Sequence, residues 1–111
     1  MQLLEPLLDD PSHDVRAAML PALGEAYAKK NTPEKLADML EDSEDSAMRR
    51  LATAAAFVTL ARTDTGSTAS LAVLKKVAAS GPPMARANAK LVTGLISGKA
   101  DGIAFLQELV P

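Results

Sequence analysis

The residues of this chain that could perform chemistry are few and widely spaced. His13 is the single histidine, and the chain contains no cysteine. Zinc sites combine several histidine, cysteine or carboxylate ligands, so His13 lacks the partners that such a site requires. We therefore interpret His13 as a solvated residue in the first turn of a helix, and the sequence predicts no metal site.

Four acidic residues lie close together in the segment 41–45: Glu41, Asp42, Glu44 and Asp45. An EF-hand calcium loop has alternating ligands, a central glycine and a terminal glutamate, and this segment lacks that pattern. The N-terminus of a helix attracts negative charge through the helix dipole, which accounts for the cluster without a bound cation. We favour this structural interpretation.

Motifs of known enzyme classes are also missing from the sequence. There is no nucleophile elbow, phosphate-binding loop or dinucleotide-binding fingerprint. The segment Gly98-Lys99-Ala100-Asp101-Gly102 contains glycines and a lysine, but it lacks the preceding strand and the spacing of a phosphate loop. The sequence therefore predicts no catalytic residue and no cofactor, and we expect a protein that is not an enzyme.

The composition narrows the range of partners. The net charge is −2 and aromatic residues make up 3% of the chain, whereas nucleic-acid-binding proteins are typically basic and often stack bases on aromatic rings. No apolar run approaches the ~20 residues of a membrane-spanning helix, and the first residues lack the pattern of a signal peptide. We expect one soluble, cytoplasmic domain without a nucleic-acid or membrane partner.

The helical spacing of apolar residues predicts an all-α chain. We expect seven helices, at about 2–9, 12–30, a short stretch after Thr32-Pro33, 46–62, 68–79, 84–98 and 101–109. Residues 63–67 are all turn-forming types and predict a loop. We expect Pro21 to kink the helix 12–30, since proline removes a backbone donor. In that helix, the apolar stripe consists of Val15, Met19, Ala22 and Ala26. We expect this stripe to be buried against Met48, Ala52 and Ala55.

A short pattern recurs three times along the chain. In each copy a turn precedes an apolar residue and an arginine, and the three arginines, Arg16, Arg49 and Arg86, lie 33 and 37 residues apart. A period in this range is typical of stacked helical hairpins, each of which cannot bury its apolar face alone.

The recurring residues resemble the HEAT repeat, a pair of antiparallel helices that stacks into an α-solenoid. The first copy matches best, through Asp10-Pro11, Val15-Arg16 and Leu23-Gly24-Glu25; the second keeps Asp42 and Met48-Arg49, and the third keeps Arg86 and Thr93-Gly94. The resemblance implies a right-handed α-solenoid of three HEAT-like hairpins plus a short C-terminal helix. We expect the chain to form a single domain over 1–111. Its units are expected at about 1–31, 32–65 and 66–98, followed by a terminal helix at about 101–109.

The resemblance also implies roles for particular residues. In the family, the turn acid and the arginine form hydrogen-bonded ladders between repeats, which here would involve Asp10 with Arg16 and Asp42 with Arg49. HEAT arrays are mostly binding scaffolds whose second helices line a concave surface. We therefore expect a non-enzymatic protein-binding or scaffolding module that uses its long helices. The alternative is an enzyme, or an enzyme accessory domain, on a HEAT-like scaffold, for example with a bilin lyase-like or DNA-repair-like activity.

The expected partner-binding residues lie on the long helices, opposite the buried stripe. Arginine and aromatic residues are frequent hot spots, which favours Arg50 and Phe57. Phe57 also has a packing interpretation, which we favour: its ring would fill space beside Gly24 and Gly94. The full expected set is Glu25, Arg50, Thr53, Phe57 and Lys90. Self-association through apolar residues of the terminal helices is also expected, through Leu3, Leu4, Leu7 and Leu8 or through Phe105, Leu106 and Leu109.

Overall fold

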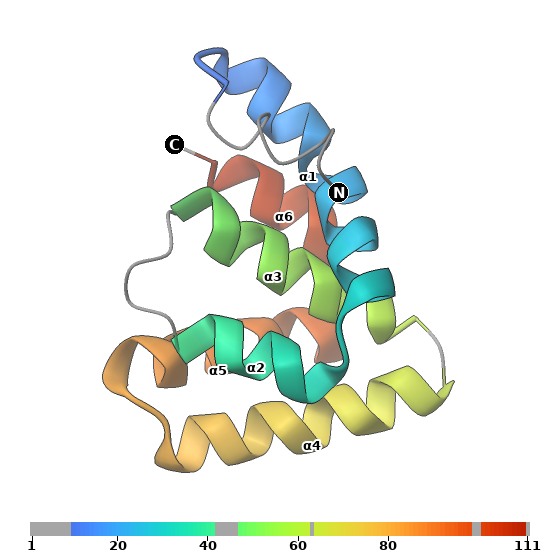
Figure 1. The fold of residues 1–111 in the computed structure, drawn as a ribbon, viewed down its shortest axis with the longest axis vertical. Coiled ribbons are helices and arrows are strands. Elements are labelled where there is room, and N and C mark those ends of the chain that lie inside the picture. Colours follow the sequence, from blue (N-terminus) through green and yellow to red (C-terminus); the bar gives the residue numbers. More distant parts are fainter. Residues whose placement is uncertain (1–9, 42–46, 63, 99–100, 111) are drawn as a thin grey trace.

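Helices account for nearly all of the chain that the structure describes (Figure 1). The structure is a computed structural model, and it describes residues 10–41, 47–62, 64–98 and 101–110. The helices within these ranges are α1 (His13–Lys30), α2 (Pro33–Glu41), α3 (Ala47–Leu60), α4 (Asp64–Ser80), α5 (Pro83–Ser97) and α6 (Gly102–Glu108). The all-α prediction is therefore confirmed, while the helix expected over 2–9 lies outside the described residues.

Side chains and backbone groups at the ends of the helices set several of the observed boundaries. The Ser12 hydroxyl accepts a hydrogen bond from the backbone N–H of Val15 at the start of α1. The Asp101 carboxylate accepts from Ile103 N at 3.0 Å and from Ala104 N at 3.3 Å at the start of α6. These bonds satisfy N–H groups that have no partner within the helix. At the C-terminal ends of the helices, Asn31 caps α1 and Gly98 caps α5, in agreement with the ends that the sequence predicts.

The start of α4 differs from the prediction. Residues 64–67 were expected in a loop, yet α4 begins at Asp64. The turn-forming types that predict a loop, Asp, Thr, Gly and Ser, are also common at helix starts, where backbone N–H groups are unpaired and acids complement the helix dipole. Composition alone therefore does not separate a loop from a first helical turn at this position.

Helix α3 lies at the centre of the fold and contacts all five other described helices. In Figure 1, α1 and α6 lie on one side of α3, α2 and α5 lie on the other, and α4 forms the far layer. The most extensive contacts join α1 to α3 and α4 to α5. Every residue of α3 from Ala52 to Val58 is buried, as expected for a helix with neighbours on all sides.

The buried face of α1 differs from the predicted stripe. Leu20, Leu23 and Tyr27 are at most 2% exposed, whereas Val15 is 36% exposed. Met19, Ala22 and Ala26 are half-buried. Burial stabilises in proportion to the apolar area removed from water, so the face with two leucines and a tyrosine packs inward in preference to the one with two alanines. The other half of the prediction is confirmed, since Met48, Ala52 and Ala55 of α3 are buried.

Two side-chain hydrogen bonds join α6 and the residues after it to α1, although these segments lie about ninety residues apart in the sequence. The Gln107 amide donates from Nε2 to the carbonyl oxygen of Ala17 at 2.8 Å. The Nε2 atom of His13 lies 3.0 Å from the carbonyl oxygen of Val110, within hydrogen-bonding distance. Ile103, Leu106 and Val110 are buried, and α6 contacts both α1 and α3. Helix α6 therefore covers part of the surface of these two long helices.

Candidate functional site

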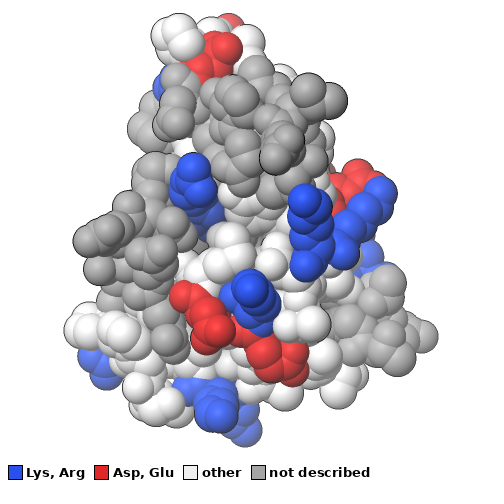
Figure 2. Space-filling view, in the orientation of Figure 1, with Lys and Arg blue, Asp and Glu red and all other residues white. Residues whose placement is uncertain are grey.

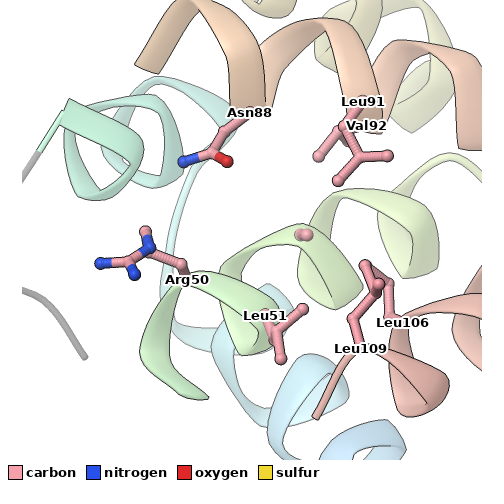
Figure 3. Close-up of a pocket in the computed structure, with 8 residues that line it drawn as sticks. Arg50, Leu51, Asn88, Leu91, Val92, Leu106 and Leu109 are labelled. Atoms are coloured by element: carbon pink, nitrogen blue, oxygen red, sulfur yellow. The ribbon is translucent and has the colours of Figure 1, made fainter. Parts of the chain in front are cut away.

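A pocket opens where α6 leaves part of α3 and α5 uncovered (Figure 3). Its volume is about 190 Å³. Sites for drug-sized ligands are usually larger, about 300–1,000 Å³, whereas an engineered cavity of about 150 Å³ holds one benzene molecule. The pocket thus has room for a single apolar side chain from a partner. Its lining residues are Arg50, Leu51 and Ala54 of α3, Asn88, Leu91 and Val92 of α5, and Leu106 and Leu109 at the α6 end.

The pocket has a polar end and an apolar end. Figure 3 shows Arg50 and Asn88 on one side and the leucines and Val92 on the other. The Asn88 Nδ2 atom is buried and has no hydrogen-bond partner. A buried donor without a partner costs free energy, and an acceptor oxygen brought by a ligand would remove that cost. The geometry therefore suits an apolar group that carries a carbonyl or carboxylate oxygen beside it.

Two of the exposed large apolar side chains line this pocket. Among the described residues, the exposed large apolar side chains are those of Val15, Leu91, Phe105 and Leu109. Leu91 and Leu109 line the pocket from opposite walls, and Phe105 lies one helical turn before Leu109 on the same face of α6. Contiguous exposed apolar groups with a polar rim are typical of interaction surfaces.

A larger hollow lies between α2 and α4 and has a different character. Its volume is about 450 Å³, and its lining includes Glu34, Asp38 and Lys76. Figure 2 shows acidic and basic residues interspersed over the face on which α2 lies. The hollow is also lined by Ala37, Ala72, Val73 and Val77, but none of the exposed large apolar side chains described above lies in it, so we place the candidate site at the α3–α5–α6 pocket.

The structure brings one of the five predicted partner-binding residues to this pocket. Arg50 lines it, whereas Thr53 and Phe57 are 0% exposed and are unavailable to a partner in this arrangement. Glu25 is exposed on α1, where it lies 3.5 Å from Lys29, and Lys90 is exposed on α5. The sequence interpretation missed Leu51, Asn88 and Leu91. It expected Leu106 and Leu109 on an exposed apolar surface, and Leu109 is indeed 45% exposed, whereas Leu106 is 0% exposed because it packs into the core. Leu91 did carry a signal, because it lies off the buried stripe of α5.

Phe57 belongs to the core, which agrees with the packing interpretation, but not for the expected reason. A Cβ atom on Gly24 would meet Ala55, and one on Gly94 would meet nothing within 4 Å. The ring therefore does not fill the space beside Gly94, and the atoms nearest to Gly24 belong to Ala55. Its burial follows from the central position of α3.

Arg16 is held within its own turn. Its guanidinium donates to the backbone carbonyl of Asp10, while the Asp10 carboxylate accepts from Ser12 N at 2.8 Å. The contact described between this turn and Arg16 is made through the backbone carbonyl of Asp10. Asp42, the acid expected to pair with Arg49, lies outside the described residues.

The candidate metal and cation residues form no ligand set in the described part of the chain. No three histidine, cysteine or acidic side chains among the described residues gather into a possible metal site. Of the acidic cluster, residues 42–45 lie outside the described ranges. His13 is not simply solvated as expected, since its ring is hydrogen-bonded to Val110 and its side chain is 55% exposed.

Comparisons with known proteins found no relative of this chain. No family model matches the chain, and neither a curated protein nor a solved structure shows a significant match. Within the ranges that the structure describes, no helix combines the length and apolar character needed to cross a membrane.

Proposed function

We propose that this chain is a non-enzymatic protein-binding module, built as a short right-handed solenoid of HEAT-like hairpins with α6 folded over its long helices. The arrangement that supports the solenoid is the lateral packing of α1 on α3, of α3 on α5 and of α2 on α4. Helices two positions apart in the chain are neighbours in such a stack, as expected for repeated hairpins.

The observation that carries the binding proposal is the pocket between α3, α5 and α6. It offers an apolar cavity for one side chain, exposed leucines on opposite walls and a polar end with Arg50 and Asn88. Interfaces bind through a few such positions, where an apolar or aromatic anchor enters a pocket and charged groups at the rim fix its orientation. The partner segment is therefore expected to present an apolar side chain next to a carboxylate or carbonyl group.

A pulldown with matched variants tests this proposal. The immobilised wild-type chain is compared with Leu91→Asp, which places a charge at the apolar wall, and with Arg50→Glu, which reverses the charge at the polar end. Lys75→Glu, at an exposed position on α4, is the charge-reversal control. We expect the two pocket variants to lose the recovered partner, and the control to keep it, while circular-dichroism melts of all four proteins stay similar.

Two outcomes would contradict the proposal. Retention of the partner by both pocket variants would exclude the pocket as the binding site. Loss of the partner on changes at Asp38 and Lys76, with no loss at Leu91, would move the site to the hollow between α2 and α4.

A further inference from the structure

The helices that line the pocket differ in charge. Helices α3 and α5 contain Arg49, Arg50, Arg86 and Lys90 and no acidic residue. Helix α6 and its N-cap contain Asp101 and Glu108 and no basic residue. These side chains are exposed, apart from Arg50, which is half-buried. Of these charged side chains only that of Arg50 lines the pocket, so the pocket lies between two basic helices and one acidic helix.

The exposed face of α6 has the composition that the pocket requires of a ligand. Phe105 and Leu109 are 41% and 45% exposed, and the exposed Glu108 lies three residues from Phe105 on the same helix. Residues three and four apart are neighbours on a helix surface, so the ring, the carboxylate and the leucine form one compact surface. This is an apolar anchor beside a carboxylate, and the pocket volume of about 190 Å³ admits a ring of this size.

We infer that a second copy of this chain occupies the pocket. In a two-fold contact the same patch is used on both copies, so each α6 lies in the groove of the other. The Phe105 ring of one copy enters the pocket of its partner, and Glu108 approaches Arg50 of that partner. This pairing of a carboxylate with a guanidinium then occurs twice in the dimer. This inference rests on the proposed function of the pocket as a protein-binding surface, and it names the partner.

The contact is expected to be weak and reversible. It uses one short helix and one groove on each copy, and interfaces that bury less than about 1,200 Å² in total are typically transient. The two charge pairs lie at the rim of an apolar contact, so they govern the orientation and specificity of the dimer.

Sedimentation equilibrium of the full chain, from about 5 μM to about 1 mM, tests the inference because it spans weak dissociation constants. The average mass of the wild-type chain is expected to rise towards that of a dimer. Arg50→Glu and Glu108→Lys, each alone, are expected to raise the dissociation constant at least about tenfold, because each places like charges opposite each other. Lys75→Glu is expected to behave as the wild type.

Mixing the two single variants gives the sharpest result. In a two-fold dimer of an Arg50→Glu copy with a Glu108→Lys copy, both pairs again have opposite signs. The equimolar mixture is therefore expected to dimerise about as well as the wild type, although neither variant does so alone. Recovery of this kind cannot follow from damage to the fold of either variant.

An NMR dilution series of the wild-type chain is a second measurement that needs no variant. Concentration-dependent amide shifts are expected at Leu91, Phe105 and Leu109, with no change at Lys75. A chain that stays monomeric over the whole range, or a mixture that associates no better than its components, overturns the inference. If the chain is monomeric but Leu91→Asp still loses another protein in the pulldown, the proposed function stands and only self-occupation of the pocket is excluded.

Discussion

Gly24 of α1 packs directly against Ala55 of α3, and no space remains between them for a side chain on the glycine. A Cβ atom placed on Gly24 would stand 2.6 Å from the Ala55 Cβ atom and 3.0 Å from its carbonyl carbon. Real Cβ atoms do not approach other atoms so closely, so any side chain at this position forces the helices apart. Gly24 thus sets the separation of α1 and α3, the most extensive contact between any two of the described helices.

We expect Gly24→Ala to destabilise the protein by about 1–3 kcal/mol, the usual cost of inserting a methyl group into a packed contact. Gly94→Ala is the matched control, because nothing lies within 4 Å of its added Cβ atom. Gly94→Ala should raise the free energy of unfolding by roughly 0.5–1 kcal/mol, since alanine is favoured over glycine inside a helix. Urea unfolding measures both effects, and the same sign for both variants would contradict the packing described.

The two phenylalanines of the chain provide a second comparison. Phe57 is 0% exposed at the centre of the fold, and Phe105 is 41% exposed on α6. Phe57→Ala should lower the free energy of unfolding by about 3–5 kcal/mol, a large part of the stability of a small domain. Phe105→Ala should change it by less than about 1 kcal/mol in dilute protein. Equal effects in thermal or urea unfolding would show that Phe57 does not occupy the core.

The cap of α6 can be tested without touching the core. Asp101→Ala removes the acceptor of two backbone N–H groups, at Ile103 and Ala104, and should cost about 0.5–2 kcal/mol. Asp101→Asn keeps a side-chain acceptor and should restore most of the loss. Amide hydrogen exchange at these two positions is the direct measurement. Unchanged protection in Asp101→Ala would mean that the carboxylate does not cap this helix.

The hydrogen bond from Gln107 to Ala17 attaches α6 to α1. Gln107→Ala should lower stability by about 0.5–1.5 kcal/mol, the usual contribution of one hydrogen bond. Gln107→Glu has nearly the same shape but presents an acceptor to the Ala17 carbonyl oxygen, so it should cost more than the alanine change. Urea unfolding at neutral pH compares them, and the reverse order would contradict the assigned bond.

Local signals explain which parts of the fold can be predicted from the sequence. Ser12, Asn31, Gly98 and Asp101 act within a few residues of their own positions, so the helix ends that they mark are readable from neighbouring residues. The buried face of α1 is not readable in this way. Apolar residues lie all around this alanine-rich helix, and which of them are buried depends on where α3 approaches.

The pocket depends on contacts that the sequence pattern does not encode locally. Arg50 was proposed from its residue type and its position on a long helix, and it lies at the pocket. Leu106 and Leu109 line the same pocket only because α6 packs on α1 and α3, helices far from it in sequence. The burial of Thr53 was missed for a similar reason, since it follows from the central position of α3 among the other helices.

The distance in sequence between α6 and the helices that it covers has a consequence for biosynthesis. His13 and Ala17 leave the ribosome before their hydrogen-bond partners, Val110 and Gln107, which follow 97 and 90 residues later. At typical elongation rates of about 5–20 residues per second, the surface of α1 and α3 that receives Ile103 and Leu106 is exposed for several seconds in the growing chain. The growing chain therefore presents an apolar surface that is covered only once residues 101–110 have emerged.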